Sequence, residues 1–143
     1  MAIQQVSVFV QNQPGALSAI CKLLAESGVD MRAMFIADTQ EFSILRLIAD
    51  DTDKAVTVLR DQNCIVAINS VIGVAVPDTP GGIAGMLRVL SEIGMNVEYT
   101  YAFVAHPGER AYVVLRVEDI ENAEDILKKA GFLLITEQDI QNL

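Results

Sequence analysis

A six-residue segment whose residue types suit the binding of an anion occurs twice in this chain. Residues 12–17 read Asn-Gln-Pro-Gly-Ala-Leu, and 66 residues later residues 78–83 read Asp-Thr-Pro-Gly-Gly-Ile. Pro can open a helix without losing a backbone hydrogen bond, and Gly lets a ligand approach the backbone closely. Unpaired N–H groups at a helix start suit a carboxylate. Both segments are therefore candidate ligand-binding loops, and the alternative for each is a capped tight turn without a ligand.

The polar residues of the two segments allow more than one helix cap. Gln13 or Thr79 could cap the following helix directly, and Asn12 and Asp78 are alternative caps. The sequence alone does not decide between them. The candidate ligand-binding residues are Asn12, Gln13, Pro14, Gly15, Ala16 and Leu17 in the first segment, and Asp78, Thr79, Pro80, Gly81, Gly82 and Ile83 in the second.

The register of these segments continues along the chain and predicts a tandem duplication. Each segment follows an alternating apolar run, at residues 6–10 and 72–76, and precedes a helical apolar pattern that should end at Gly28 or Gly94. Further strands are expected at residues 29–37, 42–48 and 64–68, and at residues 95–104, 111–117 and 132–136. Hairpin turns are expected at residues 38–41 and 105–110. A second helix in each repeat has Thr52 or Asp53, and Asp119, as its expected caps.

The predicted element order is βαββαβ, twice. It predicts an α+β fold of two ferredoxin-like units packed together, with antiparallel sheets, both helices on one face, and the first and third strands central. The domains are expected at residues 1–69 and 70–143, joined by the short linker Asn69-Ser70. Each half is small for an independent core, and 52% of the residues are hydrophobic. We therefore expect a homodimer, and the open sheet face is expected to be either covered by a partner or unusually hydrophobic for a soluble sheet.

The charge of the chain excludes several classes of partner. Ten basic and nineteen acidic residues give a formal net charge of −9, which has the wrong sign for binding nucleic acid or an anionic membrane surface. An RNA-binding sheet of the same element order would need basic and aromatic residues. The chain also lacks an apolar stretch of membrane-spanning length and a signal-like N-terminus, so a cytoplasmic protein is expected. Two isolated cysteines, Cys21 and Cys64, fit a reducing compartment.

Candidate catalytic and metal-binding residues are absent from the sequence pattern. The single histidine, His106, has no second ligand at metal-binding spacing, and we expect neither a metal nor a cofactor. A nucleophile with an adjacent base and a phosphate-binding loop are also missing. Acyl-phosphate hydrolysis on this fold should need an arginine in the strand-to-helix loop, and both loops lack one. Arg46 and Arg116 lie mid-strand, where a salt-bridged sheet face is the usual explanation. The protein is therefore not expected to be an enzyme.

A βαββαβ unit with Asn-Gln-Pro-Gly-Ala-Leu or Asp-Thr-Pro-Gly-Gly-Ile between its first strand and first helix resembles the ACT domain. The resemblance covers both halves, as in the stand-alone tandem ACT proteins of bacteria. It implies a regulatory module of amino-acid metabolism that binds an amino acid or similar effector at an interface between two copies, through this loop and nearby strand residues. Strand residues that could complete such a pocket, although most should be packing residues, are Met31, Ala33, Met34, Val97, Tyr99 and Tyr101.

The resemblance implies roles for individual loop residues. Loop amides would hold the carboxylate of the ligand, and Asn12 or Asp78 would accept from its ammonium group, the latter with a full charge. Asp78 therefore favours the second loop, while Gln13 could reach a ligand side chain or fill the first loop. Gly82, where the first loop has Ala16, suggests more room in the second. The alternative function is a protein–protein interaction module that regulates an amino-acid biosynthetic enzyme without a small ligand.

Overall fold

The computed structural model describes residues 2–38 and 42–143, and the chain divides into two compact units. The N-terminal unit is Gln4–Asn69. The C-terminal unit is Ser70–Leu143 together with the N-terminal residues up to Ile3. The hairpin turn predicted at residues 38–41 lies mostly outside the described residues. Among the described residues, none of the helices has the length and apolar character needed to cross a membrane.

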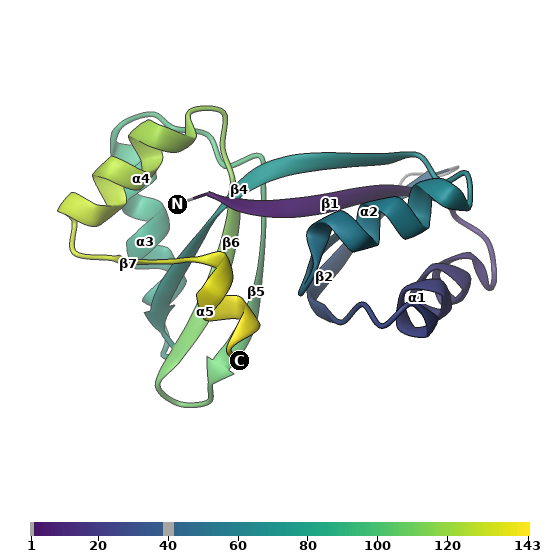
Figure 1. Ribbon diagram of the computed structural model, residues 1–143. Coiled ribbons are helices and arrows are strands. Elements are labelled where there is room, and N and C mark those ends of the chain that lie inside the picture. Colours follow the sequence, from purple (N-terminus) through teal and green to yellow (C-terminus); the bar gives the residue numbers. More distant parts are fainter. Residues whose placement is uncertain (1, 39–41) are drawn as a thin grey trace. The chain divides into compact units, whose positions relative to one another are not determined.

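The N-terminal unit has the predicted βαββαβ order (Figure 1). Its elements are β1 (Ile3–Gln11), α1 (Ala16–Glu26), β2 (Met31–Asp38), β3 (Phe42–Ala49), α2 (Thr52–Asp61) and the first residues of β4 (Val66–Pro77). The strand order is β2-β3-β1-β4, so the first and third strands are central, as predicted. Val8 and Leu45 lie opposite each other in the β1–β3 register and pack, with alternate residues of both strands, against Leu24 of α1 and Leu59 of α2.

The C-terminal unit repeats this arrangement. Its elements are the later residues of β4, α3 (Gly82–Glu92), β5 (Tyr99–His106), β6 (Arg110–Arg116), α4 (Ile120–Lys129), β7 (Leu133–Ile135) and α5 (Glu137–Gln141). The strand order is β5-β6-β4-β7, again with the first and third strands of the unit central. Val74 and Val113 are opposite residues on the core face, which packs against Met86 of α3 and Leu127 of α4. The predicted α+β fold of two ferredoxin-like units is confirmed.

The strands predicted at residues 64–68 and 72–76 are parts of one strand, β4, and Asn69-Ser70 is not a linker between elements. Hydrogen bonds explain why these two polar residues stay extended. The Ser7 hydroxyl donates to Asn69 Oδ1 at 2.6 Å, and Arg116 donates to the Ser70 carbonyl at 2.7 Å. Because Asn69 is bonded to Ser7 and Ser70 is bonded to Arg116, the two polar residues do not end the strand.

Smaller corrections concern the ends of elements. The N-cap of α2 is Asp51, whose side chain accepts from the Lys54 N–H, and not Thr52 or Asp53. Asp119 caps α4 as predicted. The second hairpin turn is confined to residues 107–109, because β5 extends to His106 and β6 begins at Arg110. Left-handed glycines follow both first helices at Gly28 and Gly94, as expected from their freedom to adopt positive φ.

The last helix, α5, was not expected from the hydrophobic pattern. It begins with a capping box in which Thr136 and Asp139 exchange hydrogen bonds, and it buries Ile140 to 1% exposure. In Figure 1, α5 lies on the side of the C-terminal sheet away from α3 and α4. Tyr112 and Val114 of β6 are buried but lie outside the core that packs against α3 and α4. The sheet face expected to stay open in this unit therefore carries a second buried layer.

Candidate functional site

The two strand-to-helix loops have the same backbone conformation. Gly15 and Gly81 each precede the helix in the left-handed region, with φ of 84° and 88°. One backbone hydrogen bond closes each turn: the Ala16 N–H donates to the Gln13 carbonyl at 3.3 Å, and the Gly82 N–H donates to the Thr79 carbonyl at 3.1 Å. Glycine is favoured at both N-cap positions because other residues pay a steric cost there. The repeated sequence therefore produces a repeated geometry.

Neither helix start is capped by a side chain, so the predicted caps at Asn12, Gln13, Asp78 and Thr79 are wrong. The physical reason is that the N-cap position is taken by a glycine, which has no side chain to accept the helix N–H groups. Within the described part of the chain, no acceptor is found for the N–H groups of Leu17 and Ser18, or for those of Ile83 and Ala84. Each loop thus presents two unpaired donors at the positive end of a helix.

Asp78 joins the second loop to the β5–β6 turn. Its Oδ2 accepts from the Gly108 N–H at 2.9 Å, and its own N–H donates to the Glu109 carbonyl at 3.1 Å. The side chain is half-buried. A carboxylate offers about four lone-pair positions, so this single bond leaves Asp78 able to accept from a ligand as well.

Gly82 does not provide room in the second loop, contrary to the expectation from the sequence. A Cβ atom at this position would overlap the carbonyl oxygen of Pro77. The glycine is needed for a close approach between the start of α3 and the end of β4. More open surface is found one residue later, where the Ile83 side chain is 41% exposed.

The structure does not bring the six suggested strand residues to the loop of their own unit. Gln11, beside the first loop, lies opposite Phe42 at the start of β3, whereas Met34 lies opposite Leu47 near its end. Tyr101 lies opposite Val114, away from the Pro77–Arg110 end of the sheet that carries the second loop. Met31 and Val97 pack on the cores and Ala33 is buried, so these residues serve packing as anticipated.

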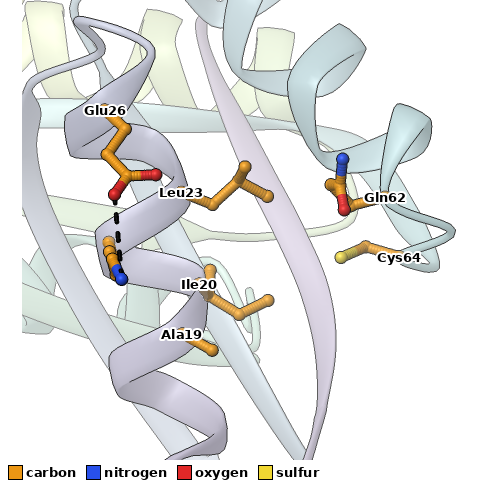
Figure 2. Close-up of a pocket in the computed structure, with 7 residues that line it drawn as sticks. Ala19, Ile20, Leu23, Glu26, Gln62 and Cys64 are labelled. Atoms are coloured by element: carbon orange, nitrogen blue, oxygen red, sulfur yellow. Dashed lines mark ion pairs between the residues drawn. The ribbon is translucent and has the colours of Figure 1, made fainter.

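The N-terminal unit has a groove of about 390 Å³ between α1 and the end of α2. Figure 2 shows Ile20 and Leu23 pointing from α1 toward Gln62 and Cys64. Lys22 and Glu26 form an exposed ion pair of 3.8 Å along α1 itself. The surface between the helices is therefore mainly apolar and is not part of the loop site.

Two smaller cavities occupy equivalent places in the two units, at the strand end that leads into each loop. In the C-terminal unit the cavity measures about 370 Å³ and is lined by Ala75, Val76, Pro77, Glu109, Arg110, Gly131, Phe132 and Leu133. In the N-terminal unit it measures about 320 Å³ and is lined by Phe9, Val10, Gln11, Phe42, Asn63, Cys64 and Ile65. The sequence pattern did not point to these cavities, although Arg110 in place of Phe42 is a visible difference between the repeats.

Arg46 and Arg116 have structural roles. Arg116 pairs with Glu98 at 3.3 Å and donates to the Ser70 carbonyl of β4 at 2.7 Å, and Arg46 donates to the Ser7 hydroxyl of β1 at 3.0 Å, so both arginines bond to residues of their own unit. A further cavity, of about 450 Å³, is lined by Glu98, Glu118 and Asp119 among others, of which Glu98 is ion-paired and Asp119 caps α4. His106 ends β5, and its side chain is not described. No grouping of three His, Cys, Asp or Glu residues that could hold a metal ion is found in the described ranges.

Two βαββαβ units in tandem, each with a glycine-bent loop at an uncapped helix start, define a tandem ferredoxin-like protein. The family model described as "ACT domain pair" matches residues 1–143, so the chain belongs to the family of ACT domain pairs. The ACT domain is a regulatory, non-catalytic module, and the match brings no catalytic family with it.

Several solved structures are similar to this chain. A protein from Bacteroides thetaiotaomicron is 34% identical, with a TM-score of 0.93 over 100% of this chain and 98% of that chain. The regulatory subunit of aspartate kinase from Thermus thermophilus is 18% identical, with a TM-score of 0.63 over 90% and 92% of the two chains. The corresponding subunit from Thermus flavus is 19% identical, with a TM-score of 0.63 over 87% and 88%. The two subunits show the shared fold alone. Among curated proteins, none matches the chain.

Proposed function

We propose that this ACT pair is an amino-acid sensor that binds an L-amino acid at its strand-to-helix loops. The observation that supports the proposal is the pair of uncapped helix starts, each with two N–H groups that lack an acceptor within the described residues. A ligand carboxylate would satisfy these donors and gain from the helix dipole. The loop residues 12–17 and 78–83 stay our predicted ligand-binding residues.

The second loop is the stronger candidate for a whole amino acid. The carboxylate of the ligand would accept from the Ile83 and Ala84 N–H groups, and its ammonium group would donate to Asp78. A charge-assisted hydrogen bond is roughly twice as strong as a neutral one. The first loop has Asn12 in place of Asp78, so we expect weaker binding of an ammonium group there.

The regulatory effect would come from a difference in ligand affinity between two states of the assembly. A ligand shifts such an equilibrium only by the difference between its binding free energies for the two states. We propose that the assembly is a homodimer in the cytoplasm, that it catalyses no reaction, and that it acts in amino-acid metabolism without a metal, nucleic acid or membrane. Light scattering with and without a bound amino acid would test the dimer directly.

A second candidate function is docking onto an amino-acid biosynthetic enzyme without a small ligand. Three large apolar side chains of the N-terminal unit favour it: Phe9, Phe42 and Ile65 are 50%, 51% and 68% exposed around one cavity. Exposed apolar patches of this kind often mark protein interfaces. The fold shared with regulatory subunits of aspartate kinase agrees with such a role, and affinity capture with a tagged chain would test it.

A thermal-shift panel of the twenty L-amino acids tests the principal proposal. A ligand at about 100 times its dissociation constant stabilises the native state by roughly 2.7 kcal/mol. We expect one amino acid, or a few similar ones, to raise the melting temperature selectively. If none does so at millimolar concentration, sensing is excluded and enzyme docking becomes the leading function.

A further inference from the structure

The cavity at the end of β4 in the C-terminal unit carries two charged groups that the fold does not use. Pro77, the last residue of β4, lies opposite Arg110 at the start of β6. On the other side of β4, Ala75 lies opposite Leu133 at the start of β7. The cavity is therefore bounded by the ends of three strands, with Phe132 and Leu133 contributing apolar surface. Its volume of about 370 Å³ is at the small end of the range for ligand pockets.

The equivalent cavity of the N-terminal unit lacks the charged residues of the C-terminal cavity. There Gln11 lies opposite Phe42, in the same way that Pro77 lies opposite Arg110. The N-terminal cavity is lined by apolar and uncharged polar residues, whereas the C-terminal cavity adds Glu109 and Arg110 to its apolar surface. Both repeats therefore have the cavity, but only the C-terminal cavity has charged residues in its lining.

Glu109 and Arg110 are exposed, and neither side chain has an ion-pair or hydrogen-bond partner among the side chains that the structure describes, which leave out those of residues 1, 38–41 and 104–106. A guanidinium group can bind a carboxylate through two parallel hydrogen bonds, and a carboxylate accepts from an ammonium group. One cation and one anion at the rim of an apolar hollow match a zwitterion with an apolar side chain. The Leu133 side chain, 59% exposed at the same cavity, would be covered by such a ligand.

We infer that this cavity is a second amino-acid site, separate from the helix-start amides, and that it takes an L-amino acid with an aliphatic side chain. The ligand carboxylate binds Arg110, the ammonium group binds Glu109, and the side chain packs on Phe132 and Leu133. This inference rests on the proposed function, because the ligand of the cavity is again an amino acid. The equivalent N-terminal cavity does not bind a zwitterion, because Phe42 replaces the arginine.

Calorimetric titration with L-leucine tests the inference in a chain whose loops are blocked. Ser18→Asp and Ala84→Asp place a carboxylate at each helix start, where it competes with a ligand carboxylate. In this chain L-leucine should still bind, and adding Arg110→Ala should weaken binding at least about tenfold, as expected for loss of a charged hydrogen bond. Arg88→Ala, which removes an exposed arginine of α3 in the same unit, is the matched control and should leave the affinity unchanged. Probes that lack one charged group, 4-methylpentanoate and 3-methylbutylamine, should each bind at least about tenfold more weakly than L-leucine.

The outcomes separate this inference from the proposed function. If the wild-type chain binds L-leucine but the loop-blocked chain does not, the cavity site is wrong and the loop sites stand. Equal affinities of the loop-blocked chain with and without Arg110→Ala also overturn the inference. If blocking the loops changes nothing while Arg110→Ala abolishes binding, the cavity site stands and the loop assignment fails. A wild-type chain that binds no amino acid contradicts both.

Discussion

At the residue scale, the loop of the C-terminal unit depends on a glycine that is needed for packing and not for ligand room. The Cβ of an alanine at Gly82 would overlap the carbonyl oxygen of Pro77, and that backbone atom belongs to the end of β4. Ala16 occupies the matching place in the N-terminal unit, so the two helix starts approach their strands differently. The geometry of the second loop therefore depends on the close packing of Gly82 against Pro77.

We predict that Gly82→Ala destabilises the protein by about 1–3 kcal/mol, the usual cost of forcing a methyl group into a filled site. Gly85→Ala is the matched control on the same helix, because a Cβ there meets open space. This control should stabilise the protein by about 0.5–1 kcal/mol through the higher helix propensity of alanine. Urea unfolding of both variants measures the difference. Equal stabilities would show that α3 does not approach Pro77 closely.

A second prediction at this scale separates the two roles given to Asp78. Asp78→Asn keeps an oxygen that can accept from the Gly108 N–H, so its stability should stay within about 0.5 kcal/mol of wild type. Asp78→Ala loses that hydrogen bond and should cost about 1 kcal/mol. Both variants lose the charge that would attract an ammonium group, so both should bind an identified amino-acid ligand about tenfold more weakly. Undiminished affinity of Asp78→Asn would remove the ammonium role while leaving the structural one.

At the scale of elements, α5 accounts for part of the stability of the C-terminal unit. We predict that Ile140→Ala costs about 2–5 kcal/mol, because this side chain is 1% exposed. The control is Leu143→Ala, two residues beyond the end of α5, where the side chain is 45% exposed and the change should stay within about 0.5 kcal/mol. Thermal and urea unfolding would detect the contrast. If the two substitutions change the free energy of unfolding equally, Ile140 of α5 does not pack against the sheet face.

Most elements could be predicted from the sequence, because the hydrophobic periods are strong and the same pattern occurs at matching positions of both repeats. It missed α5, whose five residues are too few for a helical period, although Thr136 and Asp139 have the spacing of a capping box. It divided β4 at Asn69-Ser70, because the bonds that keep these residues extended come from Ser7 and Arg116, which are distant in sequence. The loop positions followed from the Pro-Gly repeats, but the helix caps and the close contact of Gly82 depend on three-dimensional packing.

At the scale of the whole molecule, membership of the ACT domain pairs and the duplicated fold are established, and the ligand is the central question. The division into domains 1–69 and 70–143 stays a prediction that limited proteolysis can test. The units share one loop conformation but differ in chemistry: Asp78 replaces Asn12, and Arg110 replaces Phe42. We therefore expect the two halves to bind an amino acid with different affinities.

The most direct test of the account is calorimetric titration of the amino acid that gives the largest thermal shift, against wild type, Ala84→Asp and Ala84→Asn. We expect Ala84→Asp to weaken the second-loop site at least about tenfold, because its carboxylate competes for the helix-start amides. Its melting temperature without ligand should not fall, since a negative charge in the first turn favours the helix. The neutral control Ala84→Asn should keep most of the affinity. Unchanged binding by a folded Ala84→Asp chain would contradict recognition of the ligand carboxylate at this loop.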